Sequence, residues 1–166
     1  MKIVDRHLFS ELQAKAAASP RGRAHYNLHP TVEADIHRLV MAVQPPSYVR
    51  PHRHVQPDKW ELMVILHGAV SVLTFSAAGE VTGRYDLEAD GDQVAVELPE
   101  NGLHCFVVRR PDSAVIEVKR GPYQPLSEAD FAPWAPPENA PDAPAFLEKL
   151  KQAKPGDNMA AGLAGE

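Results

Sequence analysis

The chain has 166 residues, 44% of them hydrophobic, which is enough for one soluble domain with a buried core. Its formal net charge of −5 argues against a nucleic acid as the main partner. The single cysteine, Cys105, excludes a framework of intrachain disulfides and fits a reducing compartment. The sequence contains no recognisable secretory signal or membrane-spanning run, so we expect a cytoplasmic protein without a membrane partner.

The N-terminal part, residues 1–45, is predicted to contain a helix, a loop and a leading strand that pack on the rest of the domain. Residues 2–4 suggest a short strand, and Asp5 is a suitable cap for a helix over residues 6–18. Residues 21–30 have no clear hydrophobic period, so we expect an ordered loop or lid there.

The middle of the chain, residues 46–121, alternates short apolar runs with turn signals such as His67-Gly68 and Asn101-Gly102. Many short strands at this spacing favour a mainly β fold, a single double-sheet jelly-roll barrel. The predicted strands, including one that leads into the barrel, are residues 34–43, 47–54, 60–66, 69–76, 80–87, 93–98, 104–109 and 113–119.

The C-terminal part, residues 122–166, is rich in proline, so we expect an irregular extension rather than further strands. Asp142 followed by Pro144 is typical of a helix start, which predicts a short helix over residues 143–153. The small and polar residues from residue 155 onward predict a flexible tail.

Four residues form the most informative pattern in the sequence. Alternate side chains of a strand share a face, so His52 and His54 are predicted to point the same way. Glu61 and His104 add a carboxylate and a third imidazole. Such a set suits a divalent transition metal such as Fe, Mn, Ni, Zn or Cu. We therefore predict one metal ion held by these four residues.

This pattern resembles the two sequence motifs of the cupins. His52-x-His54 with Glu61-x6-Gly68 is similar to the first motif, and residues 99–104, "PENGLH", are similar to an altered second motif. The chain is further similar to the bacterial WbuC-type cupin-fold metalloproteins, through the segments "RGRAHYNLHP", "YVRPHRHVQPDKWEL" and "VKRGPYQPLSEADFAPWAP". The resemblance extends to about residue 136. It implies a metal-binding jelly roll and, by analogy, a homodimer.

The resemblance leaves two candidates for the carboxylate ligand. Asp58 lies at the distance after His54 that is usual in cupins. Glu61 keeps the usual spacing to Gly68 and begins the apolar run that follows. We prefer Glu61 for these two reasons.

The metal is predicted to lie inside the barrel, above an apolar floor. Alternation places Met63 and Ile65 on the same face of their strand as Glu61, and Phe106 on the same face as His104. These faces are expected to converge in the interior of a jelly roll, which side chains fill.

Several polar residues are candidates to surround a substrate. Arg50 lies two residues before His52, so strand alternation places its side chain on the same face as the motif histidines. A guanidinium group there favours an anionic substrate. Tyr48 and His29 are the candidates for a catalytic acid or base. The expected substrate-binding residues are Arg50, Arg21, Arg23, Asn27 and Lys119.

Three functions fit these expectations. The first is a metal-dependent enzyme, an isomerase or dioxygenase of the cupin type, that acts on a small anionic or sugar-like substrate. The resemblance adds a link to surface-polysaccharide synthesis. The second is a non-catalytic, metal-dependent protein that binds or senses a small ligand. The third is a metal-free cupin sugar epimerase, which the complete set of metal ligands makes the weakest of the three.

Overall fold

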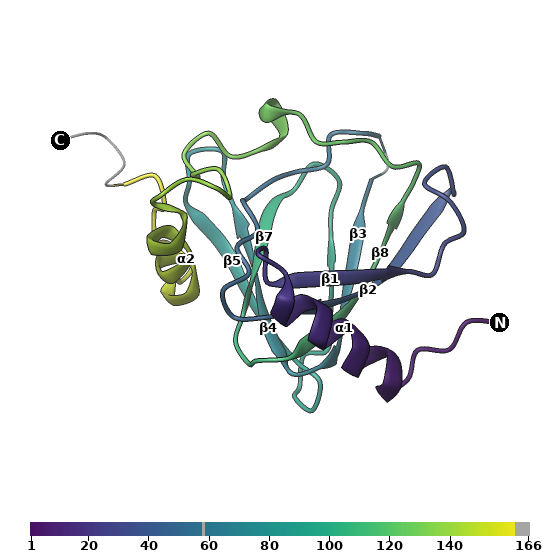
Figure 1. Ribbon diagram of the computed structural model, residues 1–166. Coiled ribbons are helices and arrows are strands. Elements are labelled where there is room, and N and C mark those ends of the chain that lie inside the picture. The colour runs from purple at the N-terminus through teal and green to yellow at the C-terminus, as the bar shows by residue number, and fades with distance from the viewer. Residues whose placement is uncertain (58, 162–166) are drawn as a thin grey trace.

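The computed structural model describes residues 1–57 and 59–161. In these residues, eight strands form two antiparallel sheets that enclose the interior of a jelly-roll barrel (Figure 1). The larger sheet has the order β1-β2-β8-β3-β6, with bounds Arg23–Asn27, Ile36–Val43, Ser113–Arg120, Glu61–His67 and Ala95–Leu98. The smaller sheet has the order β5-β4-β7, with bounds Val81–Glu88, Ala69–Phe75 and Leu103–Val108. The predicted mainly β jelly roll is confirmed.

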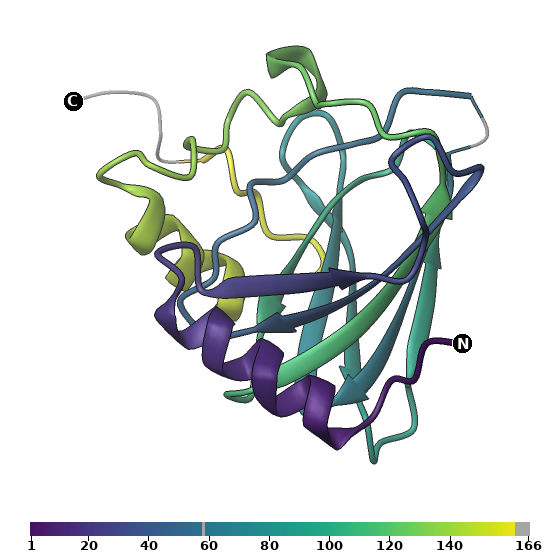
Figure 2. The same ribbon diagram turned by 45° about the vertical axis from the view of Figure 1, so that its right-hand side comes forward.

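Helix α1 spans Arg6–Ala18, as predicted, and covers the outer face of the larger sheet (Figure 2). Asp5 caps it, because a side-chain oxygen of Asp5 accepts a hydrogen bond of 3.0 Å from the Leu8 N–H. The apolar side of the helix, including Leu12, packs against Val40 of β2. This burial fixes which face of β2 points away from the barrel.

The inner face of the larger sheet carries a row of polar residues. The antiparallel register places His37 of β2 opposite Lys119 of β8, and Lys119 opposite Glu61 of β3. Two positions along on the same face, Glu117 lies next to Lys119 on β8 and Met63 lies next to Glu61 on β3, and these two residues are also opposite each other. Farther along, the same face enters the apolar interior of the barrel, which contains Met41, Val43, Met63, Ile65, Phe106, Val108 and Val115. The polar row therefore lies at one end of a barrel that is otherwise apolar.

Three sequence predictions are wrong at the level of local structure. Residues 47–54 do not form a strand; the segment is irregular, with isolated bridges at His52, because Pro51 lacks the N–H that a continuous ladder requires. Residues 21–30 are not a loop or lid, since most of this segment belongs to the edge strand β1. Residues 2–4 are not a strand.

A long irregular connection follows β8. We call residues 121–142 the C-terminal strap; it crosses the open end of the barrel (Figure 2) and contains one short 3-10 helix, η1 (Glu128–Asp130). The strap leads to α2 (Ala143–Gln152), which packs on the outside of the smaller sheet (Figure 1). The predicted helix over residues 143–153 is confirmed to within one residue.

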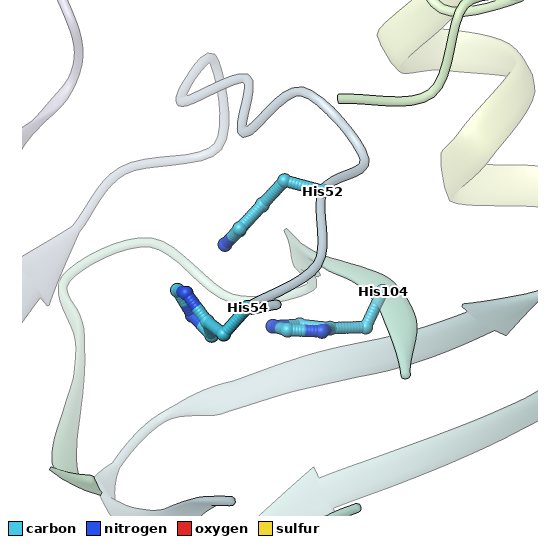
Figure 3. A group of neighbouring side chains, drawn as sticks. All are labelled: His52, His54 and His104. Atoms are coloured by element: carbon cyan, nitrogen blue, oxygen red, sulfur yellow. The ribbon is translucent and has the colours of Figure 1, made fainter. Parts of the chain in front are cut away.

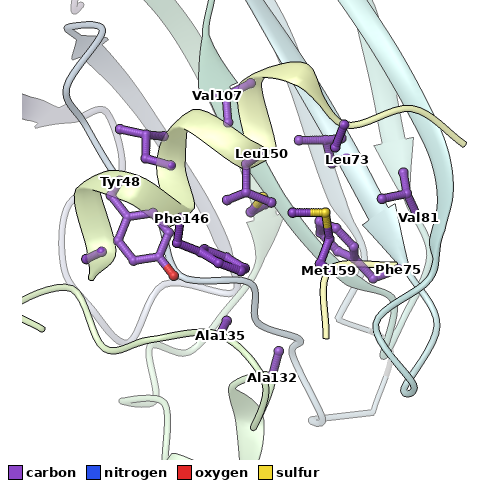
Figure 4. Packing of buried hydrophobic residues seen from close by; sticks show 14 residues of the cluster. Tyr48, Leu73, Phe75, Val81, Val107, Ala132, Ala135, Phe146, Leu150 and Met159 are labelled. Carbon is purple, nitrogen blue, oxygen red and sulfur yellow. The ribbon is translucent and has the colours of Figure 1, made fainter. Parts of the chain in front are cut away.

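Under α2 lies a second apolar cluster, outside the barrel (Figure 4). It is formed by α2, the strap and the outward-facing side chains of the smaller sheet, such as Leu73 and Val107. Cys105 belongs to this cluster, and burial raises the pKa of its thiol. Within the described part of the chain, no helix is long and apolar enough to cross a membrane.

Candidate metal centre

His52, His54 and His104 gather at the open end of the barrel, as Figure 3 shows. One potential ligand atom from each lies within 4.8 Å of the others. His54 and His104 are buried, and His52 is half-buried. The sequence prediction that these three histidines come together is confirmed.

The backbones of His52 and His104 hold each other in place. The His52 N–H donates to the His104 carbonyl at 2.9 Å, and the His104 N–H donates to the His52 carbonyl at 2.8 Å. This reciprocal pair extends the edge of β7 by a single bridge, although residues 47–54 form no strand. Two histidines that are far apart in the sequence are therefore held side by side by the sheet itself.

The same local contact orients both rings. The Nδ1 atom of His52 lies 3.0 Å from the Arg50 carbonyl oxygen, and that of His104 lies 2.8 Å from the Gly102 carbonyl oxygen. A carbonyl can only accept, so each Nδ1 carries the proton and each Nε2 is left with a free lone pair. Metal-binding histidines are usually oriented by a contact of this kind.

The Nε2 atom of His104 is buried and has no hydrogen-bond partner among the residues that the structure describes. A buried acceptor without a partner costs about 1–3 kcal/mol. It faces Glu61, whose Oε1 atom lies 3.9 Å away, which is too far for a hydrogen bond. A cation between these atoms would satisfy both, so the donor set fits a metal ion.

Glu61 begins β3 and places its carboxylate among the histidines. Its Oε2 atom lies 2.9 Å from Nε2 of His54, and the side chain is almost fully buried. The competing candidate, Asp58, lies outside the described residues.

The ionisation of Glu61 is controlled by a buried lysine. Burial alone would raise the pKa of Glu61, but Lys119, with Nζ 3.6 Å from Oε2, and the contact with His54 hold that pKa well below its usual range. Glu117 also pairs with Lys119. Together these two carboxylates raise the pKa of Lys119 despite its burial. Glu61 and Lys119 are therefore both ionised at neutral pH.

His52 and His104, in contrast, are held neutral. Burial, reinforced by the neighbouring imidazoles His104 and His54, lowers the pKa of His52 to about 3. Burial also lowers the pKa of His104. Neutral imidazoles and an ionised carboxylate are the forms that bind metals.

A cavity of about 230 Å³ opens beside these residues; we call it the metal cavity. Its apolar walls include Phe106, as predicted, whereas Met63 and Ile65 lie in the apolar interior of the barrel and do not line it. Four predicted substrate-binding residues line the cavity: Arg21, Arg23, Arg50 and Lys119.

Each arginine of this wall already has a carboxylate partner from the strap. Arg21 and Arg23 converge on Glu138, with N–O distances of 2.9 and 2.5 Å. Arg50 donates two hydrogen bonds to Glu128, of 2.9 and 2.8 Å.

Three other predicted site residues lie elsewhere. Tyr48 points into the cluster under α2, where its hydroxyl donates to the Pro136 carbonyl at 2.9 Å (Figure 4). The predicted role of Tyr48 as an acid or base beside the metal is therefore not supported, because side chains do not alternate regularly in this irregular segment. Asn27 and His29 line a neighbouring cavity beside β1 and β2.

Two carboxylates beside the metal cavity were not predicted from the sequence. Glu117 lies two residues from Lys119 on β8, so both side chains are on the same face of the strand. Alternation was therefore sufficient to place Glu117 beside the metal cavity. Glu138 comes from the proline-rich strap, which has no period that would indicate its position.

Residues 4–87 match a family model described as Domain of unknown function (DUF6016). The chain belongs to this family. The DUF6016 match includes His52, His54 and Glu61, while His104 lies beyond the matched residues. No curated protein matches the sequence.

The solved structures give the fold of this DUF6016 protein. It is similar to oxalate oxidase in complex with the substrate analogue glycolate, with a TM-score of 0.50 and 17% identity over 74% of this chain and 63% of that chain. It is also similar to KdgF from Halomonas sp. (TM-score 0.49, 21% identity, 64% of this chain and 84% of that chain). A third structure is a Cupin_2 domain of an XRE family transcriptional regulator from Enterobacter cloacae (0.46, 12%, 61% and 98%). The likeness to the oxalate oxidase structure supports the fold alone, a double-sheet jelly roll.

Proposed function

We propose that this protein is a metal-dependent cupin enzyme that acts on a small anionic substrate, with its metal held by the four residues His52, His54, Glu61 and His104. The observation that carries the proposal is the buried Nε2 atom of His104, which faces Glu61 without a hydrogen-bond partner among the described residues. Three imidazoles and one carboxylate suit Fe, Mn, Ni or Zn. When bound, such an ion supplies a Lewis acid with positions left open for a substrate oxygen.

The protein's own residues would bind and orient the substrate. Arg21 and Arg23 are proposed to hold its anionic group, because guanidinium groups pair with carboxylates and phosphates in a two-pronged way. Lys119 keeps Glu61 ionised and fixed in position. Phe106 and Phe131, which line the metal cavity, limit the entry of water.

The finer identity of the substrate follows from the sequence resemblance. A sugar-like acid fits both the cationic wall and the expected link to surface-polysaccharide synthesis. We keep the WbuC-type resemblance as part of this proposal. We also keep a homodimer and a cytoplasmic location as expectations.

The second candidate is a non-catalytic protein that binds a small ligand through its metal. It is favoured by one placement: both groups expected to act as acid or base, Tyr48 and His29, lie outside the metal cavity. Turnover of any anionic substrate by the metal-loaded protein would exclude this candidate.

Elemental mass spectrometry tests the metal. We expect about one transition metal ion per wild-type chain, and less than about a tenth of that in His52→Ala and His104→Ala, since each substitution removes a ligand. The matched control is His67→Ala, because His67 is exposed at the end of β3.

The identity of the ion then selects the assays: iron points to oxygen chemistry and zinc to Lewis-acid chemistry. If the wild-type protein holds no metal even after reconstitution, the proposal is wrong and the metal-free sugar epimerase becomes the better hypothesis. Full occupancy in His104→Ala would show that the ligand set is wrong.

Glu138 offers a test of the arginine wall, by which we mean Arg21 and Arg23 of the metal cavity. Because its carboxylate occupies both Arg21 and Arg23, we expect Glu138→Gln to bind a small carboxylate more tightly. With oxalate as the probe, calorimetry should give a gain of about threefold to tenfold, or roughly 0.6–1.4 kcal/mol. Arg21→Gln should weaken binding. Unchanged affinity in both variants would remove the arginine wall from the proposed site.

A further inference from the structure

A second cavity, of about 340 Å³, opens beside the metal cavity; we call it the histidine cavity. The residues around it come from β1, the β1–β2 connection, β2, β8 and the strap. Those that matter here are His25, Asn27, His29, His37, Lys119 and Tyr123.

The two cavities are neighbours on the same inner face of the larger sheet. On β1, Arg23 lines the metal cavity and His25, two residues farther along, lines the histidine cavity. On β2, Met41 and Leu39 divide in the same way. Lys119 lines both cavities and so stands at their common wall.

A pair of stacked imidazoles forms the most ordered part of the histidine cavity. The rings of His29 and His37 are nearly parallel, at 13°, with centroids 4.1 Å apart. Both residues are buried, with 5% and 4% of their surface exposed. The Nε2 atom of His37 donates to the Val32 carbonyl at 2.9 Å, which fixes the ring.

The contacts of His29 leave one ring nitrogen available. Its Nδ1 atom lies 3.1 Å from the Arg38 amide nitrogen and 2.9 Å from the Arg38 carbonyl oxygen. That carbonyl already accepts the Leu28 N–H at 2.8 Å, and an amide N–H can only donate, so we assign Nδ1 as the acceptor. The proton then resides on Nε2, for which the described residues provide no hydrogen-bond partner.

The backbone is shaped to leave room for this ring pair. A Cβ atom at position 121 would lie 2.8 Å from Cδ2 of His37 and 1.9 Å from the Ala34 carbonyl oxygen. Only glycine fits at Gly121, where the strap begins. The strap therefore passes directly against the stacked histidines.

The electrostatic surroundings favour an anion. Among the described residues that line the cavity, none is a carboxylate. Burial lowers the pKa of His37, and the neighbouring His29, Lys59 and Lys119 lower it further. Lys119 is already paired with two carboxylates, so hydrogen-bond donors rather than net charge must supply most of the binding.

The histidine cavity fits a second metal ion less well than an anion. Across residues 1–57 and 59–161, the one group of histidines and acids close enough to hold a metal is that of His52, His54 and His104. The imidazoles of the histidine cavity are stacked rather than convergent.

We propose that the histidine cavity binds a small anion, a carboxylate or phosphate group, through the Nε2–H of His29, with Asn27 and Tyr123 at its entrance. The anion is either a free ion or the far end of a substrate whose other end lies in the metal cavity. The site does not depend on the metal, since none of these three residues is among the proposed ligands.

Titration with inorganic phosphate, followed by NMR of the histidine rings, tests the proposal. We expect saturable shifts at the rings of His29 and His37, and at least a tenfold loss of affinity in His29→Leu. His7→Leu is the matched control, because His7 lies exposed on α1, and it should behave as wild type. If His29→Leu does not fold, the wild-type rings still decide: no saturable shift at His29 and His37 overturns the proposal, as does undiminished binding in a folded His29→Leu.

Glucose 1-phosphate distinguishes the two sources of the anion. An extended substrate predicts tighter binding than inorganic phosphate, with the gain lost in His52→Ala, which disrupts only the metal cavity. A free anion predicts equal affinities. Phosphate binding that persists in a metal-free His52→Ala protein separates this site from the proposed function.

Discussion

Tyr48 and Arg50 are two residues apart, yet their side chains leave the backbone in different directions. The Tyr48 ring packs edge-on against Phe146, with centroids 6.1 Å apart. Arg50 lines the metal cavity on the other side of the segment. Burial raises the pKa of the Tyr48 hydroxyl, which therefore stays protonated and acts as a structural donor.

We expect Tyr48→Phe to lower the free energy of unfolding by about 1 kcal/mol, since it deletes one buried hydrogen bond to the Pro136 carbonyl. Metal content should stay at the wild-type level. Chemical denaturation and elemental analysis check the two parts. A large loss of metal or of turnover in a folded Tyr48→Phe protein would return the hydroxyl to the site.

The irregular segment 47–54 is held by backbone hydrogen bonds to the C-terminal strap, which lies beside it as a neighbouring strand would. The Ala132 N–H donates to the Pro51 carbonyl, and the Arg53 N–H donates to the Asp130 carbonyl, both at 2.9 Å. Arg50 adds a 3.0 Å hydrogen bond to the Ala135 carbonyl. The backbone that carries two of the motif histidines is thus held by the strap on one side and by β7 on the other.

Arg50→Gln should loosen the strap and lower stability by about 1–3 kcal/mol, because it removes hydrogen bonds to backbone carbonyls together with packing on the Phe131 ring. Hydrogen exchange should then increase over residues 127–136. Glu128→Gln is the control: its side chain is 75% exposed, so we expect a change below about 1 kcal/mol. Equal losses in both variants would assign the hold to the ion pair instead.

The helices and strands that could be predicted from the sequence are those whose residues follow a regular hydrophobic period. Helix α1 and most strands follow from hydrophobic period and turn residues, and alternation placed Glu61 and His104 on faces that meet. The strap and the segment around Pro51 have no period, so the directions of Tyr48 and Glu138 are set by tertiary contacts alone. The short strand β1 lacks an apolar alternation, because its inner face carries polar residues such as Asn27.

The molecule as a whole divides into an apolar barrel interior and a polar open end. The row of His37, Lys119 and Glu61 lies across three strands of one sheet. Keeping ionisable groups there ties the stability of the whole fold to pH.

His37 is the group through which this dependence is best tested. Its ring stacks on His29, and burial, together with the charges of Lys59 and Lys119 and the neighbouring His29, lowers its pKa from the ordinary 6.5. Below about pH 6.5 the unfolded chain therefore takes up a proton that the folded protein does not, so stability falls as pH decreases. Measured without phosphate, unfolding of wild type between pH 7.5 and 5 should depend more steeply on pH than that of His37→Gln, by up to about 1.4 kcal/mol per pH unit. Identical slopes would show that His37 titrates normally in the folded state.

Strand β7 presents His104 to the metal cavity and the next residue, Cys105, to the cluster under α2. Because successive side chains of a strand point to opposite faces, a one-residue slip of β7 would exchange an imidazole for a thiol at the centre. Such a site would favour softer metals. The turn at Asn101-Gly102, where Asn101 has a left-handed backbone with φ of 58°, leads directly into β7. The metal preference of the proposed centre would therefore depend on one turn that contributes no ligand of its own.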